Sequence, residues 1–209
     1  MPELPEVESI RRVLKNSLIN QKLQKYKIFD ERINRFNSVN PKNLGVLLEI
    51  YRKGKILQFN FKNNSIFFHL GMSGRLDLNG IKNKHTHGIF FFDKDVLLYD
   101  DIRKFGYIKI LKNELAKKQF STLGPDALAL SKLDKIFVLN KAKKSSTSIK
   151  KFLLNQKNLS GLGNIYVNEI LFLARVHPYS ISFKLKETIW NEIFSNTKIV
   201  LKKAIKNNG

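Results

Sequence analysis

The sequence contains no cysteine, so the chain has neither disulfide bonds nor a zinc site built from thiolates. Acidic residues are scarce: 17 Asp and Glu stand against 38 Lys and Arg, a formal net charge of +21. No run of about 18 apolar residues occurs, so we expect no membrane span. The acidic, proline-marked N-terminus also lacks the basic and then apolar pattern of a signal peptide.

The composition is globular, with a large excess of positive charge. Hydrophobic residues make up 43% of the chain and aromatic residues 11%, which is enough to form a core and excludes a disordered basic tail. The charge points to a polyanionic partner, most simply nucleic acid. The alternative is a solvated, lysine-rich surface, because most of the basic residues are lysine.

Two patterns divide the chain. Apolar residues recur on one helical face from Glu6 to Leu18, just after Pro5. Short β-branched and aromatic runs then predict antiparallel strands at residues 46–51, 56–61, 65–70, 88–92, 96–99 and 106–110. After residue 126 the pattern becomes helical, with helices expected at 148–156, 164–176 and 186–206. The order predicts an α+β chain of two domains with a hinge near Ser121–Leu128.

The N-terminal residues carry the most specific chemical signal. Once Met1 is removed, Pro2 presents a secondary amine, and an α-amino group titrates near ~8 rather than the ~10.4 of lysine. Attack of such an amine on a sugar C1′ gives an iminium ion, which makes the C2′ proton acidic. Glu3 lies beside the amine, where it can deliver a proton to the sugar or the leaving base, and Glu6 follows one turn later.

The same residues also fit a purely structural interpretation. A proline after the initiator methionine is common, and carboxylates in a first helical turn are stabilised by the helix dipole. From spacing alone, both interpretations stay open.

Residues 1–8, Met-Pro-Glu-Leu-Pro-Glu-Val-Glu, resemble the opening of the formamidopyrimidine-DNA glycosylases, bacterial base-excision enzymes that remove 8-oxoguanine and ring-opened purines. Six further motifs match that family in chain order: Lys53-Gly54-Lys55, His69-Leu70-Gly71-Met72-Ser73-Gly74, Lys84-His85-Thr86-His87, Asp101-Ile102-Arg103-Lys104-Phe105-Gly106, Leu123-Gly124-Pro125 and Gly161-Leu162-Gly163-Asn164-Ile165-Tyr166. Each motif alone is weak, but the ordered set covers nearly the whole chain. The related endonuclease VIII group generally lacks the Arg-x-Phe of residues 103–105, which favours the formamidopyrimidine branch.

The resemblance implies a fold and four catalytic assignments. The fold is an N-terminal antiparallel β-sandwich with a leading catalytic helix over residues 1–122, then an all-α helix–two-turn–helix DNA-binding domain over residues 123–209. Pro2 is implied as the Schiff-base nucleophile and Glu3 as the general acid. Lys55 matches a lysine assigned to proton transfer during β-elimination, against the alternative of a solvated strand-edge lysine. Glu6 resembles a supporting carboxylate, against the alternative of an ordinary first-turn acid.

Three residues match the side chains that fill the gap left by a flipped-out nucleotide: Met72, Arg103 and Phe105. Flipping has a cost because the nucleotide must be unstacked. An apolar wedge and a planar guanidinium recover part of that cost by stacking and by pairing with the orphaned base. Without the resemblance, Met72 and Phe105 would be interpreted as core residues.

Further residues match DNA contacts of the family. His85 matches a phosphate contact, and Lys104 stands where the family has a second arginine, so we expect a weaker phosphate grip there. Lys150 matches a lysine that faces the lesion, and Asn164 matches a DNA-backbone contact. The glycines before Asn164 permit close backbone approach, and the amides of the following helix can bind a phosphate. A helix-capping asparagine in an αα-hairpin predicts the same residues.

The family continues into a lesion-capping loop and a four-cysteine zinc finger that this sequence does not contain, so we expect no metal and no cofactor. The expected protein is a monomeric glycosylase and abasic-site lyase of the bacterial cytoplasm and nucleoid. Its expected partner is double-stranded DNA that contains damaged bases or abasic sites. One alternative is a truncated, catalytically impaired DNA-binding remnant of the family. The other is an RNA- or ribosome-associated basic module that shares only the helix-turn element.

Overall fold

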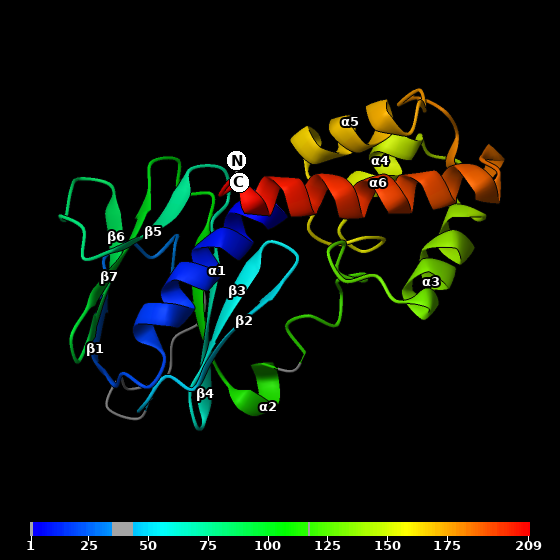
Figure 1. Ribbon diagram of the computed structural model, residues 1–209. Coiled ribbons are helices and arrows are strands. Elements are labelled where there is room, and N and C mark those ends of the chain that lie inside the picture. Colours follow the sequence, from blue (N-terminus) through cyan, green and yellow to red (C-terminus); the bar gives the residue numbers. More distant parts are fainter. Residues whose placement is uncertain (1, 35–43, 117) are drawn as a thin grey trace. The chain divides into compact units, whose positions relative to one another are not determined.

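The computed structural model describes residues 2–34, 44–116 and 118–209 (Figure 1). They divide into two compact units. The β unit contains Pro2 and the described part of Val7–Phe120, and the helical unit contains Glu3–Glu6 and Ser121–Gly209. Residues 3–6 thus belong to the same unit as the C-terminal half of the chain. The expected division into residues 1–122 and 123–209 places them in the other domain.

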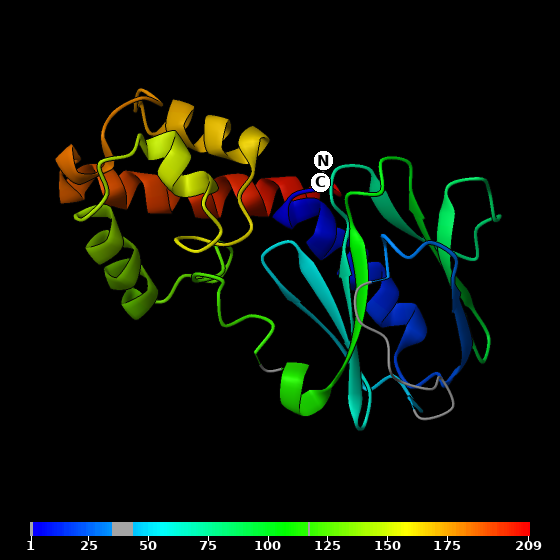
Figure 2. The same cartoon turned by 180° about the vertical axis from the view of Figure 1, so that it is seen from behind.

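Two four-stranded antiparallel sheets build the β unit, and Figures 1 and 2 show them from opposite sides. One sheet has the order β1 (Leu23–Ile28), β6 (Thr86–Phe92), β7 (Val96–Asp101), β5 (Gly74–Leu78). The other has the order β2 (Glu49–Lys53), β3 (Ile56–Asn60), β4 (Asn64–His69), β8 (Tyr107–Lys112). A short helix, α2 (Asn113–Ala116), follows β8.

A single hydrophobic core joins both sheets and the first helix, α1 (Leu4–Leu18). The ring of Phe68 on β4 lies 5.2 Å from that of Phe90 on β6 and 6.3 Å from that of Tyr99 on β7. Leu14 and Leu18 of α1 are buried in the same core. Each such buried side chain contributes roughly 1.5–3 kcal/mol of transfer free energy. The expected β-sandwich with a leading helix is therefore confirmed.

The first helix begins two residues earlier than the pattern predicts, at Leu4 rather than Glu6. Pro5 consequently lies inside the first turn, where a missing N–H removes no intrahelical hydrogen bond. The Glu6 carboxylate accepts a hydrogen bond from the backbone N–H of Glu3 at 2.8 Å. This is the backward-reaching half of a capping box, and it satisfies one of the N–H groups at the start of the helix.

The sheet pattern is otherwise close to the expected one, with one late start. The strand expected from Val46 begins only at Glu49. The N–H and C=O of Leu47 instead bond to Gln21 and Asn20. Residues 46 and 47 are thus bound to the segment before β1, and only Leu48 reaches β3, through its N–H to the carbonyl of Asn60 at 2.8 Å.

The helical unit consists of α3 (Lys132–Ala142), α4 (Ile149–Leu154), α5 (Asn164–Leu173), α6 (Glu187–Lys206) and a short 3-10 turn, η2 (Ser182–Lys184). Its core is centred on Trp190, whose ring lies 5.5 Å from that of Phe152 and 5.8 Å from that of Phe194. The helix expected at 164–176 stops at Leu173, because Arg175 adopts a left-handed backbone (φ +53°) that cannot continue it. None of the helices in the described ranges is long and apolar enough to cross a membrane.

Candidate active site and DNA-contact residues

Glu3 is held at the N-terminus of α5. Its side chain is buried, and its two carboxylate oxygens accept hydrogen bonds from the backbone N–H groups of Gly163 (2.7 Å), Ile165 (3.0 Å) and Tyr166 (3.4 Å). The start of a helix offers unpaired N–H groups and the positive end of the dipole, so it suits an anion. These amides, which the sequence suggested for a DNA phosphate, are thus already occupied by a carboxylate of the same unit.

Two glycines of the Gly-Leu-Gly motif make room for this arrangement. A Cβ on Gly163 would lie 2.3 Å from Cδ of Glu3, and one on Gly161 would lie 2.3 Å from Cδ1 of Leu4. Gly161 also has a left-handed backbone (φ +108°), and its carbonyl accepts the N–H of Leu4 at 3.1 Å. The motif therefore binds the N-terminal residues of its own chain.

Glu6 connects the same helix start to α5. Besides the Glu3 N–H, its carboxylate accepts a hydrogen bond from the hydroxyl of Tyr166 at 2.6 Å. Burial, and then the neighbouring Glu6 carboxylate, raise the pKa of the Tyr166 hydroxyl, which keeps this donor protonated. Tyr166 is not among the site residues that the motifs predict, although it closes the Gly-Leu-Gly-Asn-Ile-Tyr motif. Glu6 therefore has a supporting geometry as well as a first-turn position.

Pro2 is half-buried and directly precedes Glu3. Lys55 lies at the turn between β2 and β3, and the β unit anchors this turn. The buried Arg52 guanidinium donates to the carbonyl of Gly54 at 2.8 Å and pairs with the buried carboxylate of Glu8 at 3.0 Å. Glu8 of α1 is thus connected to the turn that carries Lys55.

Glu8 is a buried carboxylate that is bonded to three arginines. Burial alone raises its pKa, but hydrogen bonds from Arg11, Arg52 and Arg12 outweigh that effect and lower the pKa from 4.5 to about 2. The carboxylate is charged at neutral pH and serves as the hub of three arginines.

The three residues of the expected wedge lie on exposed loops. Met72 follows β4 with 42% of its surface exposed, and Phe105 precedes β8 with 54% exposed. The Arg103 guanidinium stacks over the Phe105 ring at 4.6 Å. Met72 and Phe105 are therefore not core residues, which removes the structural alternative for them.

The remaining expected DNA contacts differ in how they are held. His85 lies in the loop before β6, where its N–H bonds to the side chain of Asn83 at 2.8 Å. The Lys104 ammonium pairs with Asp30 at 2.8 Å, and hydrogen bonds from Arg32 and then Lys104 hold the pKa of Asp30 well below its usual range. Lys104 thus has a carboxylate partner within the β unit. It also lacks the guanidinium group with which an arginine binds a phosphate through two parallel hydrogen bonds.

In the helical unit, Lys150 lies in α4 and is half-buried, and Asn164 is the exposed first residue of α5. The cap of α5 is Gly163 rather than Asn164, so Asn164 is not a helix-capping asparagine. Its side chain is accessible for an external contact.

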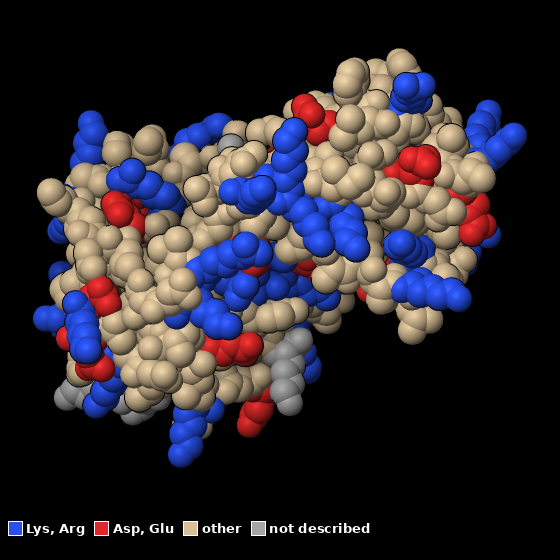
Figure 3. All heavy atoms as spheres, viewed as in Figure 1, with Lys and Arg blue, Asp and Glu red and all other residues tan. Residues whose placement is uncertain are grey.

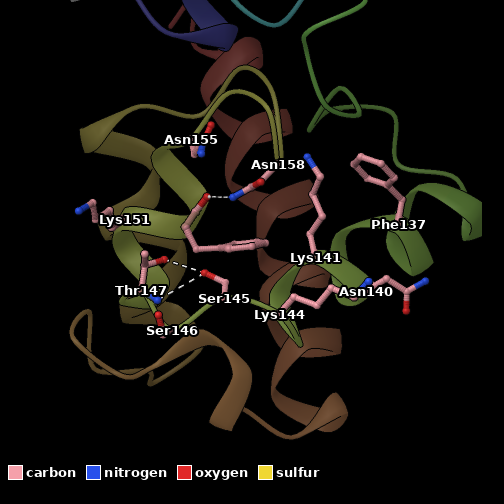
Figure 4. A pocket seen from close by; sticks show the side chains of 11 residues that line it. Phe137, Asn140, Lys141, Lys144, Ser145, Ser146, Thr147, Lys151, Asn155 and Asn158 are labelled. Atoms are coloured by element: carbon pink, nitrogen blue, oxygen red, sulfur yellow. Dashed lines mark hydrogen bonds between the residues drawn. The ribbon is translucent and has the colours of Figure 1, made fainter.

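A pocket of about 730 Å³ lies elsewhere in the helical unit (Figure 4). Its wall includes Phe137, Lys141, Lys144 and Ser145, and none of the expected site residues lines it. In Figure 4, Lys151 points away from the pocket's centre, and Lys141 extends toward the loop at Asn158. Lys141 donates to the carbonyl of Lys157 at 2.7 Å, so one cation of the pocket is already engaged.

The last two features of the site are the charge of the surface and the side chains available to bind a metal ion. Lys and Arg side chains are spread over the face shown in Figure 3, with few Asp and Glu between them. Across the described ranges, no cluster of three or more His, Cys, Asp or Glu side chains could hold a metal ion. The chain's residues do not fit a four-thiolate zinc site, because the sequence has no cysteine.

Comparison with known proteins gives this geometry a family. The sequence model of the formamidopyrimidine-DNA glycosylase N-terminal domain matches residues 1–108, and that of the H2TH domain of the same enzymes matches residues 123–209. The chain belongs to the formamidopyrimidine-DNA glycosylase family. It is therefore a base-excision repair DNA glycosylase of the class that also cleaves at abasic sites.

Individual family members agree over the full chain. The formamidopyrimidine-DNA glycosylase of Lactococcus lactis is 34% identical over 100% of this chain and 80% of its own length. That of Listeria innocua is 35% identical over 98% of this chain and 78% of its own. A solved complex of the Lactococcus lactis enzyme with DNA that contains an abasic site superposes with a TM-score of 0.89 at 32% identity, over 98% of this chain and 79% of that one. Both expected folds, the sandwich and the helix–two-turn–helix unit, are confirmed.

Proposed function

We propose that this formamidopyrimidine-DNA glycosylase removes oxidised purines, 8-oxoguanine and formamidopyrimidines, and cleaves the strand through a Schiff base on Pro2. The observation that carries the proposal is the position of Glu3. Its carboxylate is buried and fixed by three N–H groups at the N-terminus of α5, from the cap Gly163 and from two residues of the helix, directly after the proposed nucleophile. Such fixed orientation is what acid–base catalysis beside a nucleophile needs.

The proposed reaction uses three residues of the chain. The free amine of Pro2 bonds to C1′ as the glycosidic bond breaks, and the base leaves with a proton. Glu3 delivers a proton to the sugar ring oxygen or the leaving base. Once the attached amine has lost its proton, the bond between C1′ and the ring oxygen breaks, the oxygen takes up a proton, and the nitrogen lone pair forms the iminium ion. Lys55 takes part in the transfer of the C2′ proton, after which the C3′–oxygen bond breaks and the phosphate leaves. Glu6 supports the site through Tyr166 and the Glu3 backbone.

The proposed partner is duplex DNA that contains a damaged base or an abasic site. The exposed wedge supports this assignment: Met72, Arg103 and Phe105 are accessible and suited to fill a gap in a base stack. Phosphate contacts are assigned to His85, Lys104, Lys150 and Asn164. A structural neighbour from Lactococcus lactis was solved with abasic-site DNA. We further propose a monomer that works without a cofactor on the nucleoid of a bacterial cytoplasm.

Borohydride trapping tests the proposed reaction. The wild-type chain, incubated with an 8-oxoguanine duplex or an abasic-site duplex and sodium borohydride, should yield a covalent protein–DNA adduct. Pro2→Gly, which replaces the secondary amine, should lose most of the adduct. Pro5→Ala is the matched control, because it alters the other proline of the N-terminal segment and should keep the adduct. An adduct of equal yield in Pro2→Gly would contradict the proposal.

A further inference from the structure

The wedge residues lie on two separate turns of the β unit that pack backbone against backbone. Met72 lies on the turn between β4 and β5, and Arg103 and Phe105 lie on the loop between β7 and β8. A Cβ on Gly71 would lie only 2.5 Å from the backbone nitrogen of Gly106. Gly71 also has a left-handed backbone (φ +58°), so no other residue fits this contact without strain. The two turns therefore form one platform.

One carboxylate is bonded to both turns. Asp101, the last residue of β7, is fully buried, and its Oδ1 accepts the hydroxyl of Ser73 at 2.6 Å and the N–H of Arg103 at 3.2 Å. Its Oδ2 accepts the N–H of Gly106 at 2.8 Å. The Ser73 hydroxyl in turn accepts the Arg103 N–H at 3.0 Å, which closes a ring of hydrogen bonds.

These bonds hold backbone and leave the wedge side chains available. Within the ranges that the structure describes, no Lys or Arg forms an ion pair with Asp101. The buried carboxylate is therefore stabilised by the hydrogen bonds that it accepts from the two turns. The Arg103 guanidinium is stacked on Phe105 rather than bonded to Asp101. A buried carboxylate of this kind fixes the backbone of the two turns that carry Met72, Arg103 and Phe105. It does not bond to the ends of these side chains.

We propose that Asp101 is the positioning residue of the wedge: it sets the two turns in the geometry needed to fill the gap in a base stack. The inference rests on the proposed function. A pre-ordered platform lowers the entropy that insertion would otherwise cost. The role is separate from the reacting atoms, because Asp101 carries no part of the proton transfers assigned to Pro2, Glu3 and Lys55.

The test compares a substrate that needs gap filling with one that does not. Borohydride trapping is measured on an abasic site in duplex DNA and on the same abasic site in single-stranded DNA, which has no stacked partner strand. Asp101→Asn places an amide where the N–H groups of both turns need acceptors. Ser73→Ala removes the two bonds of the ring that involve the Ser73 hydroxyl but keeps the Asp101 carboxylate. It serves as a second variant if Asp101→Asn does not fold, as judged by circular dichroism.

Asp95→Asn is the matched control. Asp95 lies at the opposite end of β7, and its carboxylate also accepts side-chain hydrogen bonds, from Asn79 and Gln21. We expect Asp101→Asn to lower trapping on duplex relative to single-stranded DNA by about tenfold, the size of effect that loss of hydrogen bonds to a charged group produces. Ser73→Ala should lower this ratio less, and Asp95→Asn should leave it at the wild-type value.

Three outcomes decide between the possibilities. An unchanged duplex-to-single-strand ratio in folded Asp101→Asn, or in Ser73→Ala if only that variant folds, would overturn the positioning role. An equal fall in Asp95→Asn would also overturn it, because a general loss of sheet stability would then explain the result. Absence of any adduct from the wild-type chain would instead contradict the proposed function and leave the wedge without a reaction to serve.

Discussion

The N-terminal acids and the wedge residues are held in opposite ways. Glu3 is buried, and three backbone N–H groups fix its carboxylate. Met72 and Phe105 are large apolar side chains with about half of their surface exposed, and the hydrogen bonds that hold their turns are formed by neighbouring residues, Ser73, Arg103 and Gly106. The hydrogen bonds hold the Glu3 carboxylate in one orientation. The wedge side chains leave apolar surface exposed to water, where a binding partner can cover it.

This contrast predicts different consequences for the two regions. A change at Glu3 should affect both folding and chemistry, because the side chain is part of the packing of the helical unit. A change at the wedge should affect only the handling of duplex DNA.

Glu3→Gln should have the largest effect on activity. The glutamine is the same size but cannot act as an acid, and its amide group meets N–H donors where an acceptor is needed. We expect single-turnover excision of 8-oxoguanine to fall by roughly 10²–10⁴-fold. Binding of an abasic-site duplex should change much less. A near wild-type rate would contradict the catalytic assignment of Glu3.

Gly163→Ala tests whether the Gly-Leu-Gly motif serves the N-terminus. The added Cβ would lie 2.3 Å from the Glu3 carboxylate carbon, so the carboxylate must leave α5. We expect a loss of about 1–3 kcal/mol in the free energy of unfolding and a matching loss of adduct. Gly80→Ala is the control, since its Cβ meets only the end of the Asp77 side chain, which can move. Equal stability of the two variants would show that the motif has another purpose.

Phe105→Ala and Met72→Ala should separate activity from stability. Because both side chains are exposed, the free energy of unfolding should stay within about 0.5 kcal/mol of wild type in urea titrations. Excision from duplex DNA should fall about tenfold, since the gap in the stack is no longer filled. A large loss of stability with unchanged excision would show that the two side chains serve the packing of the β unit and not the handling of DNA.

Acid should weaken the β unit through Glu8. Its folded pKa of about 2 lies below the ordinary 4.5, so its contribution to stability is present above pH ~4.5 and is lost as the pH falls toward 2. We expect a loss on the order of 1 kcal/mol between about pH 5 and about pH 3. Glu8→Gln should be less stable at neutral pH and should show a flatter dependence over this range. An unchanged slope in urea titrations at several pH values would contradict the role of the arginine hub.

Hydrophobic patterning predicted every strand of the β2–β3–β4–β8 sheet, but only the two inner strands, β6 and β7, of the other sheet. The two strands that it did not predict, β1 and β5, are both edges of the same sheet. An edge strand buries fewer of its side chains, and β1 carries exposed Lys25 and Lys27 between its apolar residues. Helix α3 was missed for a related reason, because only Val138 and Ala142 of its residues are buried. A strand or helix that buries few side chains has few apolar residues at regular spacing, so its sequence pattern is hard to recognise.

Site residues could be named from motifs, but their bonding could not. The carboxylate of Glu3 bonds to residues 160 and more positions away in the chain. The pairing of Lys104 with Asp30 likewise joins segments that no local pattern connects. Both interactions are set by tertiary packing. The sequence therefore indicates which residue types are present for the chemistry, and the fold decides which of them are already bonded.

The position of the covalent bond to DNA tests whether Pro2 is the nucleophile. The adduct trapped by borohydride on an abasic-site duplex is digested with nuclease and protease, and the modified peptide is sequenced by mass spectrometry. If Pro2 is the nucleophile, we expect a sugar-derived fragment on the Pro2 nitrogen, at the start of a peptide from which Met1 is absent. A fragment on a lysine side chain, such as that of Lys55 or Lys150, would contradict it.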